Sequence, residues 1–305
     1  MQDKYQSGIT EREAEEMREQ ARARQDKENR IKMNKRALEI TCYVGGAGAF
    51  SVFIRWLQTM QAFNEQGLVD KSFWNVGVPL IIFATAFMVL RFIDRARNMR
   101  YYLPEDFFQA LSNPGKAFTI VRWAVGAVMT AGAVLLLMES ETDKDAGFYL
   151  VLALLGIVNG LVYPVLLTAA NKPLASRPSL VCFCAFVPIL FFSVWLITCF
   201  RVNSINSVLW SYGLEIITII VALLAFYHMA GFAFNSADPW RSMFFAMQGS
   251  AMCIMIMADE RYMGLEIMYL GSALMLLLYN WIMITNLRQR PKEQKEQPND
   301  GFERL

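Results

Sequence analysis

The chain of 305 residues has little of the chemistry on which most enzymes and metal sites depend. It contains one histidine, His228, and five cysteines, and every cysteine lies in an apolar segment. It has no His-Glu-x-x-His or Gly-x-Ser-x-Gly sequence, no glycine-rich phosphate loop and no Cys-x-x-Cys pair. One histidine also cannot supply both axial ligands of a bis-histidine haem. These absences disfavour an enzyme, and we expect no metal, no cofactor and no catalytic residues.

Charged residues are scarce in the middle of the chain. Residues 1–36 carry 10 basic and 8 acidic side chains and residues 286–305 carry 5 and 4, so the 249 residues between them hold only 29 of the 56 charges. Apolar residues make up 55% of the chain, against about 45–50% in soluble domains. This distribution excludes a soluble globular enzyme, a disordered protein and a typical nucleic-acid binder. It predicts a polytopic membrane protein with polar ends.

Eight apolar segments are long enough to cross a bilayer as helices, which takes roughly 17–25 residues. They cover residues 38–62, 76–93, 119–138, 147–169, 180–200, 208–234, 242–258 and 263–286. A membrane barrel would need shorter strands of alternating polarity, and these segments do not alternate. We therefore predict an all-α bundle of eight transmembrane helices. This transmembrane domain, residues 37–286, lies between a charged N-terminal tail, residues 1–36, and a polar C-terminal tail, residues 287–305.

The distribution of lysine and arginine predicts the orientation. In all, 24 of the 29 basic residues lie in or beside the two tails and the loops 94–118, 170–179 and 235–241, whereas the opposite loops hold four basic residues against nine acidic ones. Basic residues flanking membrane spans stay on the cytoplasmic side, so both termini are predicted to be cytoplasmic. The chain has no Asn-x-Ser/Thr glycosylation sequon, which is typical of a bacterial cell membrane.

Two cytoplasmic segments are candidates for contacts with partners. The first span is preceded by four basic residues: Arg30, Lys32, Lys35 and Arg36. We expect them to lie among anionic lipid headgroups. The tail before them favours a solvated charged helix, and the alternative is a docking helix for a protein partner. The 94–118 loop is expected to form a short interfacial helix near residues 104–112, either a simple connector or a second docking site.

Two ionisable residues fall inside predicted spans, where charge is costly and is a functional candidate by default. Arg55 in the first span and Glu215 in the sixth lie at nearly equal depth toward the outer side. Equal depth and opposite charge lead to the hypothesis that the two side chains form an ion pair. The alternative is that Arg55 extends to the outer interface while Glu215 faces a wet vestibule.

Two more polar residues lie deeper in the predicted membrane. His228 is on the cytoplasmic half of the sixth span, where it is a candidate for proton relay or pH sensing, or else a packing residue. Asn159 falls near the middle of the fourth span. His228 and Glu215 are thirteen residues apart in one helix, roughly 20 Å along its axis, so they cannot form a single local site.

Glycine and proline residues near Asn159 suggest irregular helices. Gly156 and Gly160 allow close helix approach, and Pro164 and Pro188 are candidate breaks in the fourth and fifth spans. Interrupted helices with polar groups at mid-membrane are typical of transporter solute sites. Glycine and proline also serve packing alone in membrane helices.

The sequence therefore supports two hypotheses of different classes. The first is a permease-like transporter of a small solute or ion, whose path includes Arg55, Glu215, Asn159 and His228. The alternative is a non-catalytic membrane subunit, sensor or scaffold that docks a cytoplasmic partner. A polar cavity containing Asn159 would favour transport, whereas a tightly packed bundle with an apolar cytoplasmic groove would favour a partner.

Overall fold

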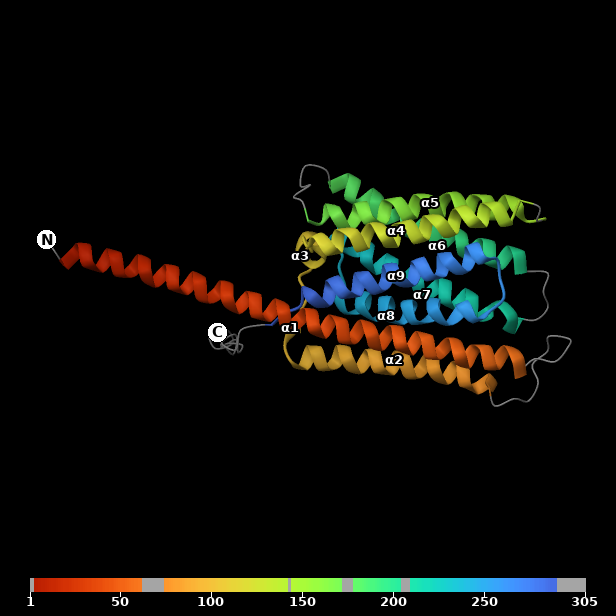
Figure 1. Cartoon of the computed structure of the whole chain (residues 1–305), viewed down its shortest axis with the longest axis horizontal. Coiled ribbons are helices and arrows are strands. Elements are labelled where there is room, and N and C mark those ends of the chain that lie inside the picture. Colours follow the sequence, from red (N-terminus) through yellow and green to blue (C-terminus); the bar gives the residue numbers. More distant parts are fainter. Residues whose placement is uncertain (1–2, 62–73, 142–143, 172–177, 204–208, 290–305) are drawn as a thin grey trace, which may run out of the picture.

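The fold is a bundle of long helices, shown in Figure 1 as a computed structural model. The structure describes residues 3–61, 74–141, 144–171, 178–203 and 209–289. Its long helices are α1 (Asp3–Gln61), α2 (Trp74–Asn98), α4 (Lys116–Glu139), α5 (Ala146–Ala169), α6 (Pro178–Asn203), α7 (Leu209–Ala233), α8 (Pro239–Met255) and α9 (Met263–Thr285). Short elements are β1 (Tyr101–Tyr102), α3 (Phe107–Leu111), a 3₁₀ turn η1 (Ile256–Ala258) and β2 (Arg288–Gln289).

The all-α prediction is confirmed. Eight described helices are long and apolar enough to cross a membrane, and each coincides with one predicted span. The ends differ by a few residues. The first span begins earlier than predicted, at Ile31, and the second continues to Asn98.

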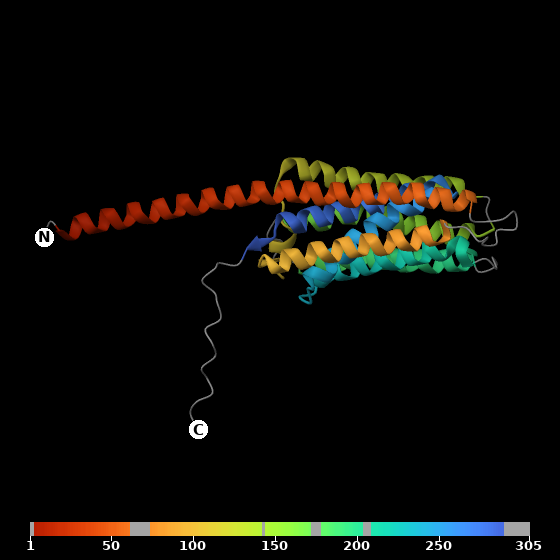
Figure 2. The same cartoon turned by 90° about the horizontal axis from the view of Figure 1, so that it is seen from below.

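Helix α1 is much longer than a membrane is thick. Its 59 residues extend about 88 Å at the rise of an α-helix, and only Ile31–Gln61 is apolar enough to span. The preceding part projects away from the bundle as one continuous rod (Figures 1 and 2). We call the end of the bundle from which it projects the proximal end and the opposite end the distal end. The charge distribution predicts that the proximal end is cytoplasmic.

Helices α8 and α9 form the centre of the bundle. Helix α9 packs against α4, α8 and α1, and α8 packs against α7, α1 and α2. Helices α4 and α5 lie together on one side, and α1 and α2 lie together on the other (Figure 1). Helix α2 packs against α1, α8 and β1. It is the most peripheral of the eight described spans, because only 17% of its apolar window is buried.

Glycines bring α4 and α5 into backbone contact, as the sequence predicts. A Cβ atom on Gly160 would lie 2.7 Å from the carbonyl oxygen of Gly126, and one on Gly156 would lie 2.9 Å from Cβ of Ala133. The expected helix breaks do not occur, since α5 continues through Pro164 and α6 through Pro188. One turn after Pro164, the Thr168 hydroxyl donates to the carbonyl oxygen of Pro164 over 2.6 Å.

The 94–118 connector contains a short helix within the predicted range. Its helix forms, at 107–111, and the Asp106 carboxylate caps it by accepting a bond from the Gln109 amide. However, the apolar face of the helix turns into the bundle against α9 and α7, and Phe107, Ala110 and Leu111 are buried. A part-buried polar side chain holds the connector in place, because its buried carbonyl groups need partners within the protein. The Asn286 side chain donates to the carbonyl oxygens of Ala110 and Ser112 over 2.8 and 2.9 Å.

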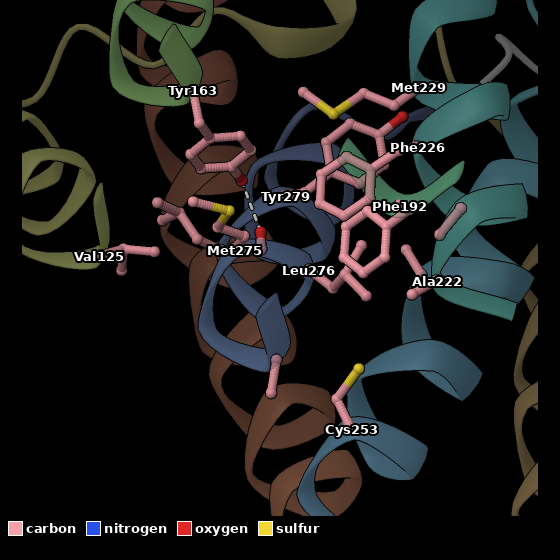
Figure 3. Close-up of a cluster of buried hydrophobic side chains, with 14 of the residues drawn as sticks. Val125, Tyr163, Phe192, Ala222, Phe226, Met229, Cys253, Met275, Leu276 and Tyr279 are labelled. Carbon is pink, nitrogen blue, oxygen red and sulfur yellow. Dashed lines mark hydrogen bonds between the residues drawn. The ribbon is translucent and has the colours of Figure 1, made fainter. Parts of the chain in front are cut away.

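The middle of the bundle is filled by large side chains from α5, α6, α7 and α9 (Figure 3). The Tyr163 hydroxyl donates to the carbonyl oxygen of Met275 over 2.5 Å. The ring of Phe226 stacks against Phe192 at 5.1 Å between centroids and lies edge-on to Tyr163 at 6.3 Å. These residues are at most 1% exposed, so this layer is densely packed.

Candidate functional site

Charged side chains gather at the distal end, where five residues form a continuous ionic chain. In order of contact they are Arg55, Asp259, Arg261, Glu215 and Tyr269. Arg55 comes from α1, Glu215 from α7 and Tyr269 from α9, whereas Asp259 and Arg261 lie in the turn between η1 and α9. The chain thus ties three helices and one turn together.

The first link is a two-pronged ion pair. Arg55 donates from Nε to Oδ1 of Asp259 over 2.7 Å and from Nη2 to Oδ2 over 3.1 Å. Its Nη1 donates to Oε1 of Gln58 over 2.6 Å. Arg55 is only 3% exposed. Each of the three nitrogen atoms of the planar guanidinium therefore donates to an acceptor.

Arg261 carries the chain from one carboxylate to the next. Its Nη2 lies 2.9 Å from Oδ2 of Asp259 and 3.4 Å from Oε2 of Glu215. The Tyr269 hydroxyl donates to the other carboxylate oxygen of Glu215 over 2.8 Å, and its ring centroid lies 5.6 Å from the Arg261 guanidinium carbon. Burial acts to lower the pKa of Arg261, but the attraction of Glu215 and the other acidic groups outweighs it, and the pKa is raised above the usual arginine value.

The hypothesis of a direct pair between Arg55 and Glu215 needs correction. Both side chains are buried in one ionic network, but Asp259 and Arg261 stand between them. Nothing in the sequence places these two residues inside, because their charges mark a turn between spans. The turn folds over the end of the bundle, and its charges enter the gap between α1 and α7.

A cavity of about 580 Å³ opens beside this chain, between α5, α6, α7 and the turn before α9. Its lining includes a cluster of acidic and basic side chains, namely Glu215, Asp259, Glu260 and Arg261. Four aromatic residues also line it: Tyr149, Trp195, Tyr212 and Tyr262. Smaller groups complete the wall, among them Thr198, Cys199 and Asn203 from α6.

The cavity has an excess of negative charge. Three carboxylates and one guanidinium line it, and Arg55 neutralises Asp259 from behind, so one carboxylate is left in excess over the arginines. Tyr149 and Tyr262 meet edge to face at 5.5 Å between ring centroids. Carboxylates together with aromatic faces are the groups that attract organic cations.

Aromatic rings close the cavity toward the membrane centre. Trp195 lies 4.4 Å from Tyr269 and 5.7 Å from Phe192, measured between ring centroids. Phe192 in turn stacks on Phe226, within the dense layer of Figure 3. The cavity therefore reaches from the distal end only as far as these rings.

Asn159 lies beyond this barrier and does not line the cavity. It is fully buried, and its Nδ2 lies 4.0 Å from the sulfur of Met275. Its Oδ1 atom has no hydrogen-bond partner within the described part of the chain. The predicted mid-membrane ligand is thus separated from the ionic chain by side chains.

His228 is also outside the cavity. Its ring stacks on Phe245 of α8 at 5.3 Å with nearly parallel planes, and Tyr227 packs edge-on against it at 5.4 Å. Because α7 runs from the distal to the proximal end, His228 lies toward the end opposite Glu215. The structure therefore brings Arg55 and Glu215 into one network and leaves Asn159 and His228 apart from it.

Comparisons with known proteins add no function to this geometry. The chain matches no protein-family model, no curated protein and no solved structure. Within the described ranges, no group of three or more histidine, cysteine, aspartate or glutamate residues is arranged to hold a metal ion.

Proposed function

We propose that the chain is a permease-like membrane protein that binds a small organic cation in the distal cavity. The observation that carries this proposal is the cavity's lining, which combines three carboxylates, one arginine and four aromatic side chains. A volume of about 580 Å³ lies within the roughly 300–1,000 Å³ of small-molecule sites. By the charge distribution, this cavity opens to the outside of the cell.

The arrangement favours alternating access over a continuous pore. The cavity opens at the distal end and stops at Trp195 and Tyr269, while buried α3 packs against the proximal ends of α7 and α9. A carrier exposes its solute site to one side at a time. These two features support a carrier that is open to the distal side.

The ionic chain suggests how a solute would act on the helices. The contact between Arg261 and Glu215, at 3.4 Å, is longer than that between Arg261 and Asp259, at 2.9 Å. A cation entering the cavity competes with Arg261 for Glu215, and Arg261 keeps Asp259 as its partner. Asp259 also binds Arg55 of α1. Binding of a cation in the cavity therefore weakens the link between α7 and the turn before α9, and leaves the link between this turn and α1 in place.

Uptake into proteoliposomes tests this proposal. Tetramethylammonium, choline and a primary amine serve as cationic probes, with acetate and glycerol as an anionic and a neutral comparison. We expect uptake of at least one cation by the wild type and its loss in Glu215→Gln, which keeps an acceptor for Tyr269 but removes the charge. Glu266→Gln is the matched control, because Glu266 lies on α9 outside the cavity lining.

The outcomes separate the alternatives. Equal uptake by the wild type and Glu215→Gln would remove Glu215 from the site. Uptake of acetate in preference to every cation would overturn the assigned charge. Stabilisation of the wild type by a cation, without uptake of that cation, would indicate a receptor and not a carrier.

A second function, a membrane subunit or sensor that docks a cytoplasmic partner, is favoured by the projecting part of α1 and by the absence of Asn159 from the lining of the distal cavity. This helix continues far beyond the bundle (Figure 2), and residues 1–36 of the chain are densely charged. Removal of residues 3–28 distinguishes the two functions. A carrier without a docking role keeps full uptake, whereas a docking subunit loses its partner in a pull-down with the bundle still folded.

A further inference from the structure

A second cavity, unrelated to the distal site, lies between α1, α2 and α8 toward the proximal end. Its volume is about 420 Å³, and we call it the α1–α2 groove. On α1 the groove extends from Met33 to Ala47, which are fourteen positions and about 21 Å apart along the helix. The groove therefore runs along the helices from the proximal end to the middle of the membrane span.

The walls of the groove are mainly apolar. Ile40 and Val44 line it from α1, and Val89 and Phe92 line it from α2. It is bounded on one side by the most peripheral helix, whose neighbouring residues Phe87 and Leu90 are 62% and 52% exposed. In a membrane, hydrocarbon chains surround such a helix, and an apolar groove at this depth suits an acyl chain.

The proximal mouth of the groove is basic. Arg36 and Arg95 line it together with one acidic residue, Glu39, which leaves one net positive charge. Arg36 donates from Nη1 to the Tyr101 hydroxyl over 3.0 Å, and its guanidinium carbon lies 5.5 Å from the Tyr101 ring centroid. This contact holds one of the five guanidinium N–H groups and orients the plane, and a guanidinium suits the oxygens of a phosphate.

We propose that the α1–α2 groove binds one acyl chain of an anionic glycerophospholipid, with the phosphate between Arg36 and Arg95. Along the helices, the apolar wall lies toward the middle of the span and the basic mouth toward its proximal end. The acyl chain and headgroup of a membrane lipid follow the same order. The mouth lies at the end of the span that is flanked by basic residues, which the positive-inside rule assigns to the cytoplasmic side. The cytoplasmic leaflet is the one that carries anionic headgroups. A soluble phosphate compound would leave the apolar wall uncovered, so the site takes a membrane lipid.

Native mass spectrometry of the full chain tests this site. Purified protein is exchanged into detergent with equimolar phosphatidylglycerol and phosphatidylcholine of the same acyl chains. We expect about one phosphatidylglycerol retained per wild-type chain, in preference to phosphatidylcholine. Arg36→Gln combined with Arg95→Gln is expected to lower phosphatidylglycerol affinity about tenfold.

Two further variants keep the test interpretable. Arg91→Gln is the matched control, because Arg91 is an exposed arginine of α2 that does not line the groove, and it should retain the lipid. Ala47→Phe fills the deep end of the groove and leaves the basic mouth intact, and it should lower retention as well. Folding of each variant is followed by size-exclusion chromatography.

Three results would overturn the proposal. Equal retention of both lipids by the wild type would indicate non-specific annular lipid. Equal loss of phosphatidylglycerol in Arg91→Gln and in the double variant would assign the effect to net charge. Displacement of the lipid by glycerol 3-phosphate at the lipid's own concentration would show that the groove holds no acyl chain.

Discussion

Helices α8 and α2 differ in opposite directions in hydropathy and in burial. Helix α8 is the least hydropathic of the eight spans, yet 67% of its central window is buried, whereas the more hydropathic α2 has only 17% buried. In a soluble protein the more apolar helix would be the buried one. Lipid solvates apolar side chains as well as a protein interior does, so the polar helix gains most from internal packing.

Individual residues show the same contrast. The interior of α8 and α9 includes a series of buried polar side chains: Ser242, Gln248, Ser250, Ser272 and Asn280. By contrast, Leu80, Phe83 and Phe87 of α2 are more than half exposed. Close packing and contacts between polar side chains therefore stabilise the central helices. The composition of the peripheral helices is set by their contact with lipid.

The largest effect is expected where the ionic chain joins α1 to the turn before α9. Arg55→Met leaves a buried carboxylate with one partner fewer, and such a loss costs about 3–5 kcal/mol. Arg241→Met is the control, because the ion pair of Arg241 with Asp238 is solvent-exposed, with the Arg241 side chain 72% exposed, and should cost about 0–1 kcal/mol. Reversible unfolding in mixed micelles measures the loss of unfolding free energy in both variants. Equal losses in Arg55→Met and Arg241→Met would show that the distal charges stabilise the fold no more than surface charges do.

The same network makes a prediction about pH. The pKa of Arg261 is raised in the folded protein, so its stabilising contribution is complete below the usual arginine pKa and is lost only above the raised value. Deprotonation of Arg261 therefore contributes no change in stability between about pH 6 and about pH 9. The measurement is the difference in unfolding free energy between the wild type and Arg261→Met from about pH 6 to about pH 9. This difference is expected to show no change that is due to titration of Arg261. A decline with a midpoint near neutrality, in the wild type but not in an Asp259→Asn, Glu215→Gln background, would contradict the assignment.

A smaller loss is expected where α4 and α5 touch. Gly160→Ala places a methyl group against the backbone carbonyl of Gly126 and against Thr130, and since backbone cannot yield, the cost is about 3 kcal/mol. Gly45→Ala is the matched control, because no atom lies within 4 Å of an added Cβ there, and it should be neutral or stabilising by about 0.5–1 kcal/mol. Thermal unfolding midpoints distinguish them, and an unchanged midpoint in Gly160→Ala would refute close α4–α5 contact.

The smallest effects come from leucine truncations, which compare centre and periphery directly. Leu276 of α9 is fully buried (Figure 3), and Leu80 of α2 is 62% exposed. Leu276→Ala leaves a cavity and should cost about 2 kcal/mol, whereas Leu80→Ala only exchanges protein atoms for lipid and should stay within about 0.5 kcal/mol. Comparable losses in both would mean that α2 is packed against protein in the functional state.

Much of the fold is predictable from sequence, for physical reasons. An apolar run of about 20 residues has few alternatives to a membrane helix, so all eight spans are predictable. The glycines of α5 predict a close helix approach, but the sequence does not identify α4 as the neighbour. The prolines are misleading, because Pro164 and Pro188 are accommodated within continuous helices. The connector helix at 107–111 is predictable, but its burial is not, because its amphipathic pattern suits a membrane surface and a bundle end equally well.

The candidate site is only half predictable. Charge inside an apolar run identifies Arg55 and Glu215, because a charge is rarely kept within the membrane unless it has a partner or a function. Asp259 and Arg261 carry no such signal, since turns are normally charged and only the folded chain shows that this turn covers the bundle. The excess of acidic residues in the loops on this side is the one sequence feature that indicates the cavity's charge.

Saturation binding of radiolabelled tetramethylammonium to the purified chain is the most direct test of the distal cavity as a cation site. The wild type and Glu266→Gln are expected to bind it saturably and equally. Glu215→Gln should bind at least about tenfold more weakly, because it lacks the carboxylate that pairs with the cation. Undiminished binding by Glu215→Gln, or no binding by the wild type while neutral or anionic solutes bind, would contradict the account.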